Sequence, residues 1–202
     1  MKSQSGKLDQ PVSPSRDHIS GPHQALMQLV EYGDYECPHC RRAHAVVRNM
    51  QQHFGEEFSY TFRHLPNVKL HPNARLAAEA AEAAAAQGRF WEMHDAMFES
   101  TATLDLAGLT DIAEKLGLDM EQFRADLETH AWSARVQEDL DSAIRSSSQG
   151  TPTFYVNGRR YDGAWDTAAL AEALQPRLGF RMKSLSQDFA GLPASGGLVL
   201  LL

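Results

Sequence analysis

Apolar residues follow three different spacings over the first third of the chain. Residues 25–32 are mostly apolar and predict a buried strand. From 38 to 54 the apolar residues recur at steps of three and four, which predicts a helix. Aromatic residues then occupy every second position from 58 to 62, which predicts a second strand over 58–64.

The middle of the chain, residues 67–148, predicts a helical insertion. Gly88 ends an alanine-rich helix, and Asp105 can cap a later one. Asp119 and Gln122 have the spacing of a capping box. The predicted helices cover residues 74–87, 90–98 and 107–116, a stretch after Asp119, and residues 131–146. We expect this insertion to pack over the candidate site described below.

The last third of the chain predicts a hairpin and a helix. Asn157-Gly158 supplies a two-residue turn within a hairpin over 153–162, and a helix is expected from 166 to about 175. These elements predict an α/β fold with a central mixed sheet flanked by helices. Residues 1–23 are interpreted as an N-terminal extension and 24–178 as one domain. The tail, 179–202, is expected to be poorly ordered.

Cys37-Pro38-His39-Cys40 contains both cysteines of the chain and lies where the first strand leads into a helix. Pro38 suits the first helical position, which makes Cys37 the N-cap. Free backbone N–H groups and the positive end of the helix dipole then face the sulfur of Cys37 and favour its thiolate. We expect Cys37 to be the attacking, partly exposed thiol and Cys40 the resolving thiol, with His39 helping to stabilise the thiolate.

Two other interpretations of the cysteine pair remain open. A structural disulfide between positions i and i+3 would close a very short loop and stabilise the fold little. A zinc site needs about four ligands, and no second cysteine pair is present to supply them. We therefore favour a redox dithiol and expect no metal and no cofactor.

Composition narrows the range of partners. The formal net charge of −7 disfavours a nucleic acid or an anionic membrane surface as the partner. No apolar run reaches the length of a signal peptide or of a membrane span. Only two cysteines, both in one motif, fit a cytosolic protein, so we expect a cytoplasmic location. An exported form stays open if the N-terminus is truncated.

The segments 30–40 and 150–154, VEYGDYECPHC and GTPTF, resemble the DsbA-like branch of the thioredoxin-fold superfamily over roughly residues 17–177. The resemblance implies a thioredoxin-like fold with the helical insertion between its βαβ half and its ββα half. It implies a cis Pro152 packed against the cysteines, and a backbone at Thr151 that binds an extended substrate. It also implies that Glu31 moves protons to and from the thiols; the alternative is a carboxylate at the solvent edge.

The resemblance therefore implies a thiol:disulfide oxidoreductase that acts on protein or peptide substrates. Its redox partner stays open, with the glutathione and thioredoxin systems as possibilities. Thr151 stands where oxidising members often carry Val, so the direction of electron flow also stays open. A chaperone-like peptide-binding module and a glutathione-dependent isomerase are the alternatives. Asp34 and Glu36 are expected to be solvated loop carboxylates.

Overall fold

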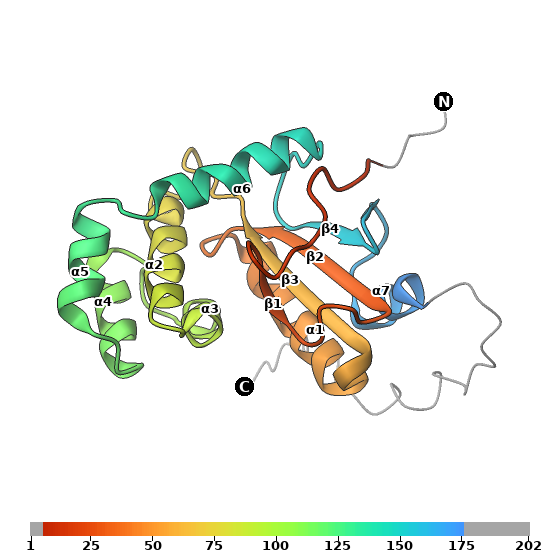
Figure 1. Ribbon diagram of the computed structural model, residues 1–202, viewed down its shortest axis with the longest axis horizontal. Coiled ribbons are helices and arrows are strands. Elements are labelled where there is room, and N and C mark those ends of the chain that lie inside the picture. The colour runs from red at the N-terminus through yellow and green to blue at the C-terminus, as the bar shows by residue number, and fades with distance from the viewer. Residues whose placement is uncertain (1–5, 176–202) are drawn as a thin grey trace, which may run out of the picture.

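A single mixed sheet forms the centre of the protein (Figure 1), whose computed structural model describes residues 6–175. Its strands are β1 (His18–Ser20), β2 (Met27–Gly33), β3 (Phe58–His64), β4 (Thr153–Val156) and β5 (Arg159–Tyr161). They lie in the order β1-β3-β2-β4-β5. The β2–β3 pair is parallel, whereas the other neighbouring pairs are antiparallel. The predicted α/β class is therefore confirmed.

The helices lie close to the predicted ranges. They are α1 (Pro38–Phe54), α2 (Ala74–Ala86), α3 (Phe90–Glu99), α4 (Leu106–Lys115), α5 (Met120–Glu128), α6 (Ser133–Arg145) and α7 (Thr167–Leu174), with a short 3₁₀ turn at Gly55–Glu57. The Asp105 carboxylate accepts the Gly108 amide, as expected of a cap. The Asp119 carboxylate caps α5, but its own backbone amide donates to Gln87 instead of closing a capping box with Gln122.

Strand alternation gives the two faces of the sheet different chemistry. Met27, Leu29 and Glu31 of β2 point to the face that α1 and α7 cover, where the main core lies. Val30 and Tyr32 point to the opposite face and pack near α6 and the N-terminal segment. Because successive strand residues face opposite sides, Glu31 shares its face with the helix that carries the cysteines.

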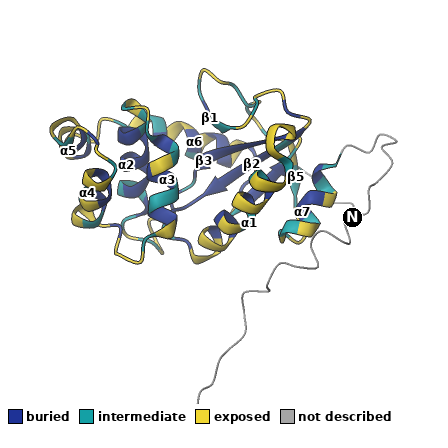
Figure 2. Cartoon of the chain, turned by 90° about the horizontal axis from the view of Figure 1, so that it is seen from below, coloured by how far each residue is buried: buried dark blue, intermediate teal, exposed yellow. Residues whose placement is uncertain are grey.

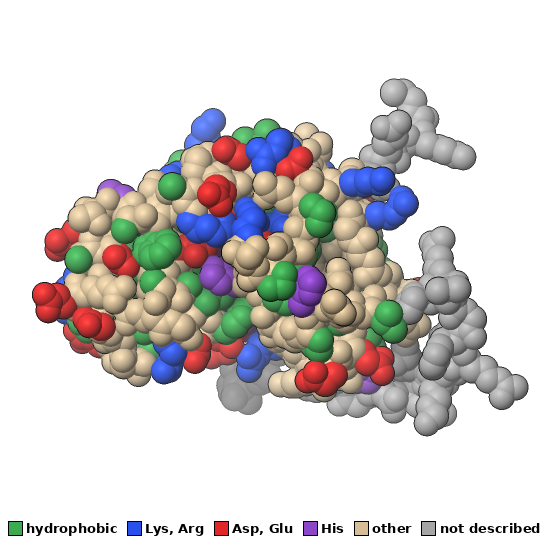
Figure 3. Space-filling view, in the orientation of Figure 1, with side chains coloured by type: hydrophobic (Ala, Val, Ile, Leu, Met, Phe, Trp, Pro, Cys, Tyr) green, Lys and Arg blue, Asp and Glu red, His purple; other side chains and the backbone are tan. Residues whose placement is uncertain are grey.

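The predicted insertion is a helical layer placed between β3 and β4 in the chain. Its central helix, α2, contacts α3, α4, α5 and α6, and most of its residues are buried (Figure 2). Small alanine side chains permit this close packing on several sides at once. Figure 3 shows acidic side chains gathered over α4 and α5, at the end of the insertion farthest from the sheet.

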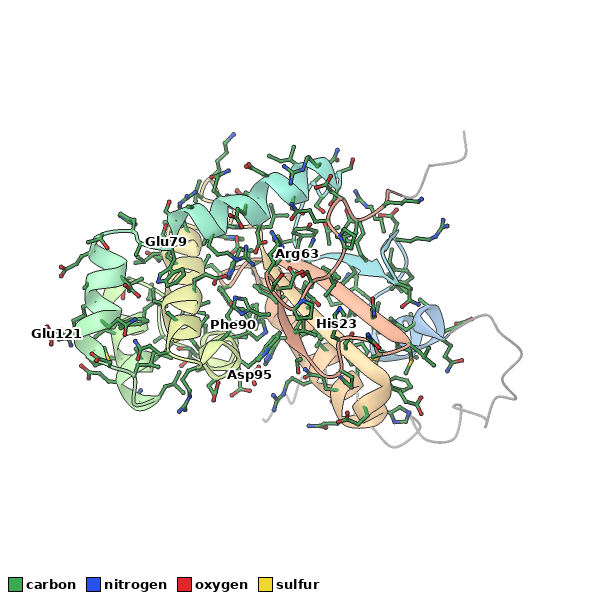
Figure 4. All side chains as sticks on the ribbon, in the orientation of Figure 1. His23, Arg63, Glu79, Phe90, Asp95 and Glu121 are labelled. Atoms are coloured by element: carbon green, nitrogen blue, oxygen red, sulfur yellow. The ribbon has the colours of Figure 1, made fainter. Side chains whose placement is uncertain are left out.

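The N-terminal extension contributes a strand that the sequence pattern did not predict. β1 pairs with the outer side of β3, and Lys7 forms an isolated bridge with Arg159 of β5. Just before β1 in the chain, Asp17 accepts hydrogen bonds from the fully buried guanidinium of Arg63, which Figure 4 places over the sheet. Three mostly polar residues carry too weak an alternation to indicate a strand. The tail expected to be poorly ordered lies outside the described residues.

Candidate active site

Cys37 is the N-cap of α1, as the sequence predicts. Its backbone is extended, with φ −73° and ψ 122°, and the helix begins at Pro38. The Cys37 amide donates to the carbonyl of Asp34, which closes a turn just before the helix. The Cys37 thiol lies 3.4 Å from the carbonyl oxygen of Thr151. Cys37 retains only 5% exposure, less than the partly exposed sulfur expected from the sequence.

The two thiols, which are free in the structure, have opposite acidities. A hydrogen bond from the Cys40 thiol is the largest cause that lowers the pKa of Cys37 from 9.0 to about 5. The Thr151 side chain and the backbone amides of Cys40 and His39 lower this pKa further, while burial opposes them. Burial raises the pKa of Cys40, and the hydrogen bond to Cys37 raises it further. Cys37 is therefore the more acidic of the two thiols and carries the larger thiolate fraction at neutral pH.

Glu31 is a buried acid beside this pair rather than a carboxylate at the solvent edge. It is 1% exposed, and the Tyr60 hydroxyl donates to its Oε2 atom at 2.8 Å. Burial raises the pKa of Glu31 to about 7, although hydrogen bonding to Tyr60 and to Cys40 lowers it partly. A carboxyl group that titrates near neutral pH can accept a proton from a thiol and return it.

Two acids that the sequence predicts to be solvated hold the loop between β2 and α1, and for Asp34 that prediction is wrong. Asp34 is 2% exposed, and its carboxylate accepts hydrogen bonds from the Glu36 amide, the Asn67 amide and the His71 ring. Glu36 accepts two hydrogen bonds from Asn73. An Asp that bonds the amide two residues ahead is a known turn signal, and it could have indicated this role for Asp34.

The His39 side chain bonds to Arg42, one turn further along α1. The ring is exposed, and its Nδ1 atom accepts a hydrogen bond from Arg42 at 2.6 Å. A guanidinium group carries only donors, so Nδ1 must be the unprotonated ring nitrogen. The backbone amide of His39, not its ring, is among the causes that lower the pKa of Cys37. A direct effect of the ring on the thiolate stays a prediction.

Thr151 and Pro152 lie beside Cys37, at the place that the resemblance implies. Tyr32 near the end of β2 pairs with Thr153 at the start of β4, so the preceding two residues reach the N-terminus of α1. The Thr151–Pro152 peptide bond is cis, as predicted. Asn157 and Gly158 both have positive φ, which is typical of the turn predicted between β4 and β5.

Two groups of side chains in residues 6–175 have ligand atoms within 4.8 Å of one another, close enough to share a metal ion: His44, His94 and Asp95, and His64, Glu82 and Asp139. Arg48 already pairs with Asp95, which Figure 4 places on α3. Arg16 and Arg135 pair with Asp139. Because cationic side chains already neutralise these carboxylates, both groups fit ion pairs between elements better than metal sites.

An N-cap thiol of low pKa that faces a buried partner thiol and a cis-proline loop, on a sheet of this topology, defines a dithiol protein of the thioredoxin fold. A family model described as Thioredoxin matches residues 13–176. The chain belongs to this family.

Solved structures of DsbA-like thiol-disulfide oxidoreductases share the fold. A thioredoxin-like oxidoreductase from Silicibacter pomeroyi DSS-3 is 29% identical, with a TM-score of 0.71 over 80% of this chain and 91% of that chain. BdbD from Bacillus subtilis is 24% identical, with a TM-score of 0.71 over 84% of this chain and 97% of that chain. The α-DsbA1 protein from Wolbachia pipientis is 20% identical, with a TM-score of 0.69 over 83% of this chain and 92% of that chain.

Curated relatives carry a different kind of name. A Na⁺/H⁺ antiporter, NhaA 1, from Salinispora arenicola is 48% identical over 164 residues, which are 81% of this chain and 25% of the antiporter. A Na⁺/H⁺ antiporter, NhaA, from Herminiimonas arsenicoxydans is 44% identical over 83% of this chain and 27% of the antiporter. The chain thus spans about a quarter of the length of these relatives.

The names of these relatives contradict the description of the protein as a cytoplasmic oxidoreductase and nothing more, because a cytoplasmic location is not established. The oxidoreductase part of that description is supported by the family model and by the solved structures. The cytoplasmic location was expected from the cysteine count, and two cysteines in one motif do not by themselves determine where a protein resides. Among residues 6–175, no helix is both long enough and apolar enough to cross a membrane.

Proposed function

We propose that this chain exchanges disulfides with protein or peptide substrates through Cys37 and Cys40. The observation that carries the proposal is the placement of Cys37 at the N-cap of α1, 3.4 Å from the Thr151 carbonyl and beside the buried Cys40. This placement gives the two sulfurs opposite acidities, with the pKa of Cys37 lowered to about 5 and that of Cys40 raised. A pair with equal acidities would have no preferred attacking sulfur. This asymmetry also favours a redox role over the structural-disulfide and metal interpretations of the motif.

In the reducing direction, the Cys37 thiolate attacks one sulfur of a substrate disulfide, and the other substrate sulfur leaves as a thiolate. Glu31 then takes the proton of Cys40, and the Cys40 sulfur attacks the sulfur of Cys37. The mixed disulfide breaks, the substrate leaves as its second thiolate, and Cys37–Cys40 is now a disulfide. In the oxidising direction the same steps run in reverse.

The Thr151 backbone is proposed to position the substrate. Its carbonyl oxygen lies 3.4 Å from the Cys37 sulfur, so a peptide that bonds to this backbone would place its own sulfur near the nucleophile. The proposal for Thr151 and Pro152 also rests on the family resemblance described above.

Trapping of mixed disulfides tests the enzyme proposal. Cys40→Ala leaves the nucleophile without its resolving partner, so it should accumulate covalent adducts with a disulfide-containing peptide. The matched variant Cys37→Ser should form none. Adducts on Cys40 in the Cys37→Ser protein would reverse the assignment. If the native protein exchanges no disulfides, yet a variant that combines Cys37→Ser with Cys40→Ala binds the peptide tightly, the peptide-binding module is favoured.

A second candidate function is favoured by the length of the curated relatives. Because the chain matches about a quarter of proteins named as Na⁺/H⁺ antiporters, we propose that it serves as a redox domain for an ion antiporter, either within one polypeptide or as a separate partner. The test is transport by a relative of this kind under reducing and oxidising conditions, with and without its residues equivalent to Cys37 and Cys40. Identical transport in all four cases would refute this role.

A further inference from the structure

Asp34 and His71 form an ion pair next to the redox centre that the exchange steps above leave unused. The Nδ1 atom of His71 lies 2.8 Å from Oδ2 of Asp34. The Asp34 backbone also touches both sulfur-bearing residues, because its carbonyl accepts the Cys37 amide and its amide lies 3.5 Å from the Cys40 sulfur. One buried residue therefore connects the His71 ring to both cysteines.

The charges around His71 all favour its protonated form. The ionisable groups with the largest effect on the ring are Asp34, Cys37 and Glu36. Burial opposes the charge, but the hydrogen bond and the negative charge of Asp34 outweigh burial and raise the pKa of His71, and the charges of Cys37 and Glu36 raise it further. The side chain is 18% exposed, so the ring can exchange protons with solvent.

We propose that His71 is a proton acceptor coupled to the oxidation state of the Cys37–Cys40 pair, binding its proton more tightly when the pair is reduced. The reason is that a negative charge exists on Cys37 only in the reduced state. By linkage, protonated His71 stabilises the thiolate and favours the reduced pair by the same factor. This proposal rests on the proposed function only in requiring that the pair cycles between dithiol and disulfide.

The proton and electron balance can be written for reduction by glutathione. Two glutathione thiols supply two electrons and release two protons as their own disulfide forms, and the Cys37–Cys40 bond breaks. One proton goes to the Cys40 sulfur, while the Cys37 sulfur stays a thiolate. The second proton goes to His71 in molecules whose ring was neutral, and to solvent in the others.

Nuclear magnetic resonance of the His71 ring, titrated in the oxidised and in the reduced protein, measures the coupling directly. The His71 signal is assigned by its loss in His71→Asn. We expect the midpoint in the reduced protein to be higher by about half a pH unit, which corresponds to about a threefold change in proton affinity. Equal midpoints in a protein whose cysteines cycle normally would overturn the inference. Failure of the pair to form a disulfide would overturn the proposed function as well.

The redox equilibrium with glutathione gives a second readout. The Asn amide in His71→Asn can occupy the place of Nδ1 and donate to Asp34, so this variant removes the charge while keeping the bond. His23→Asn is the matched control, because His23 is exposed near the opposite end of β2 from Cys37. At pH values below the His71 midpoint, we expect the equilibrium ratio of reduced to oxidised pair to be about threefold higher in the native protein than in His71→Asn. Above that midpoint, the two ratios should be equal. A constant ratio at all pH values, or the same change in His23→Asn, would contradict the coupling; if His71→Asn does not fold, the native titration alone decides.

Discussion

Removing the Cys40 thiol should raise the pKa of Cys37, because the hydrogen bond from that thiol is the largest cause of its low value. The shift from 9.0 to about 5 is four units, or about 5 kcal/mol in favour of the thiolate. A hydrogen bond to a charged group is worth about 1.5–3 kcal/mol, which is about one to two pKa units. Cys40→Ala should therefore titrate one to two units above the native protein. The backbone amides at the start of α1 should still keep this pKa below 9.0.

Two variants separate the hydrogen bond from the rest of the site. Cys40→Ala removes the donor, whereas Cys40→Ser keeps a hydroxyl that can donate to the Cys37 sulfur. Cys40→Ser should therefore titrate closer to the native protein than Cys40→Ala does. The assay is the ultraviolet absorbance of the thiolate against pH in reduced protein, with Cys37→Ser as the blank, together with the pH dependence of alkylation.

Either of two results would refute this reasoning. A Cys40→Ala midpoint as low as the native one would show that the start of the helix alone stabilises the thiolate. A native midpoint near 9.0 would show that the thiolate is not stabilised at all. If the low pKa is observed, only the two units below pH 7 stabilise the reduced pair at that pH. They contribute about 3 kcal/mol, or about 60 mV toward a more oxidising disulfide.

Three further predictions concern residues around the site. The raised pKa of Glu31 means that the folded protein retains a proton that the unfolded chain loses between pH 4.5 and about 7. Glu31→Gln should therefore increase the free energy of unfolding by up to about 3 kcal/mol above pH 7 and leave it unchanged near pH 4. It should also slow the attack of Cys40 on the mixed disulfide. If urea unfolding gives the same difference between variant and native protein at both pH values, this prediction is wrong. If the His39 ring stabilises the Cys37 thiolate, as the sequence predicts, His39→Ala should make the disulfide harder to reduce by up to about 30 mV in glutathione buffers. An unchanged potential would show that only the His39 backbone amide acts on the thiolate. Gly33→Ala would place a Cβ atom 2.4 Å from the Phe62 ring and should cost about 1–3 kcal/mol in urea unfolding. Gly150→Ala, where nothing lies within 4 Å of the new atom, should be nearly neutral, and equal losses in both would rule out the steric explanation.

The fold could be predicted from sequence wherever one regular spacing was long enough to see. The helix that starts at Pro38 and the strand with alternating aromatic residues both lie at the predicted bounds. β1 could not be predicted, since a strand of three residues has no measurable period and exists because β3 offers it a partner. β2 shows the same limit for Glu31. A mostly apolar run does not tell which side of the sheet an acid faces until the helix layer is placed.

The sequence predicts the part of the candidate site whose residues are neighbours in the chain. It predicts only incompletely the part where distant segments meet. The Cys-Pro-His-Cys motif carries its own local geometry, so the N-cap position of Cys37 followed from the residues alone. Asp34 was interpreted as solvated because its main partners, Asn67 and His71, are more than thirty residues away. Tyr60, which donates to Glu31, was seen only as part of an alternating strand. In both cases a polar side chain found its partner only through the packing of the fold.

The buried Arg63 has a practical consequence for any shortened form of this protein. Its guanidinium group donates hydrogen bonds to the Asp17 carboxylate, to the Tyr32 hydroxyl and to the carbonyl oxygens of Gln10 and Pro11. A fragment that begins at residue 24 would keep the cysteine motif and the cis-proline loop, yet it would lack the carboxylate and the two carbonyl oxygens that accept hydrogen bonds from this guanidinium. Losing one partner of a buried pair costs about 3–5 kcal/mol, a large share of the stability of a domain this size. Expression of this domain, alone or fused behind another protein, should therefore retain everything from Lys7 onward.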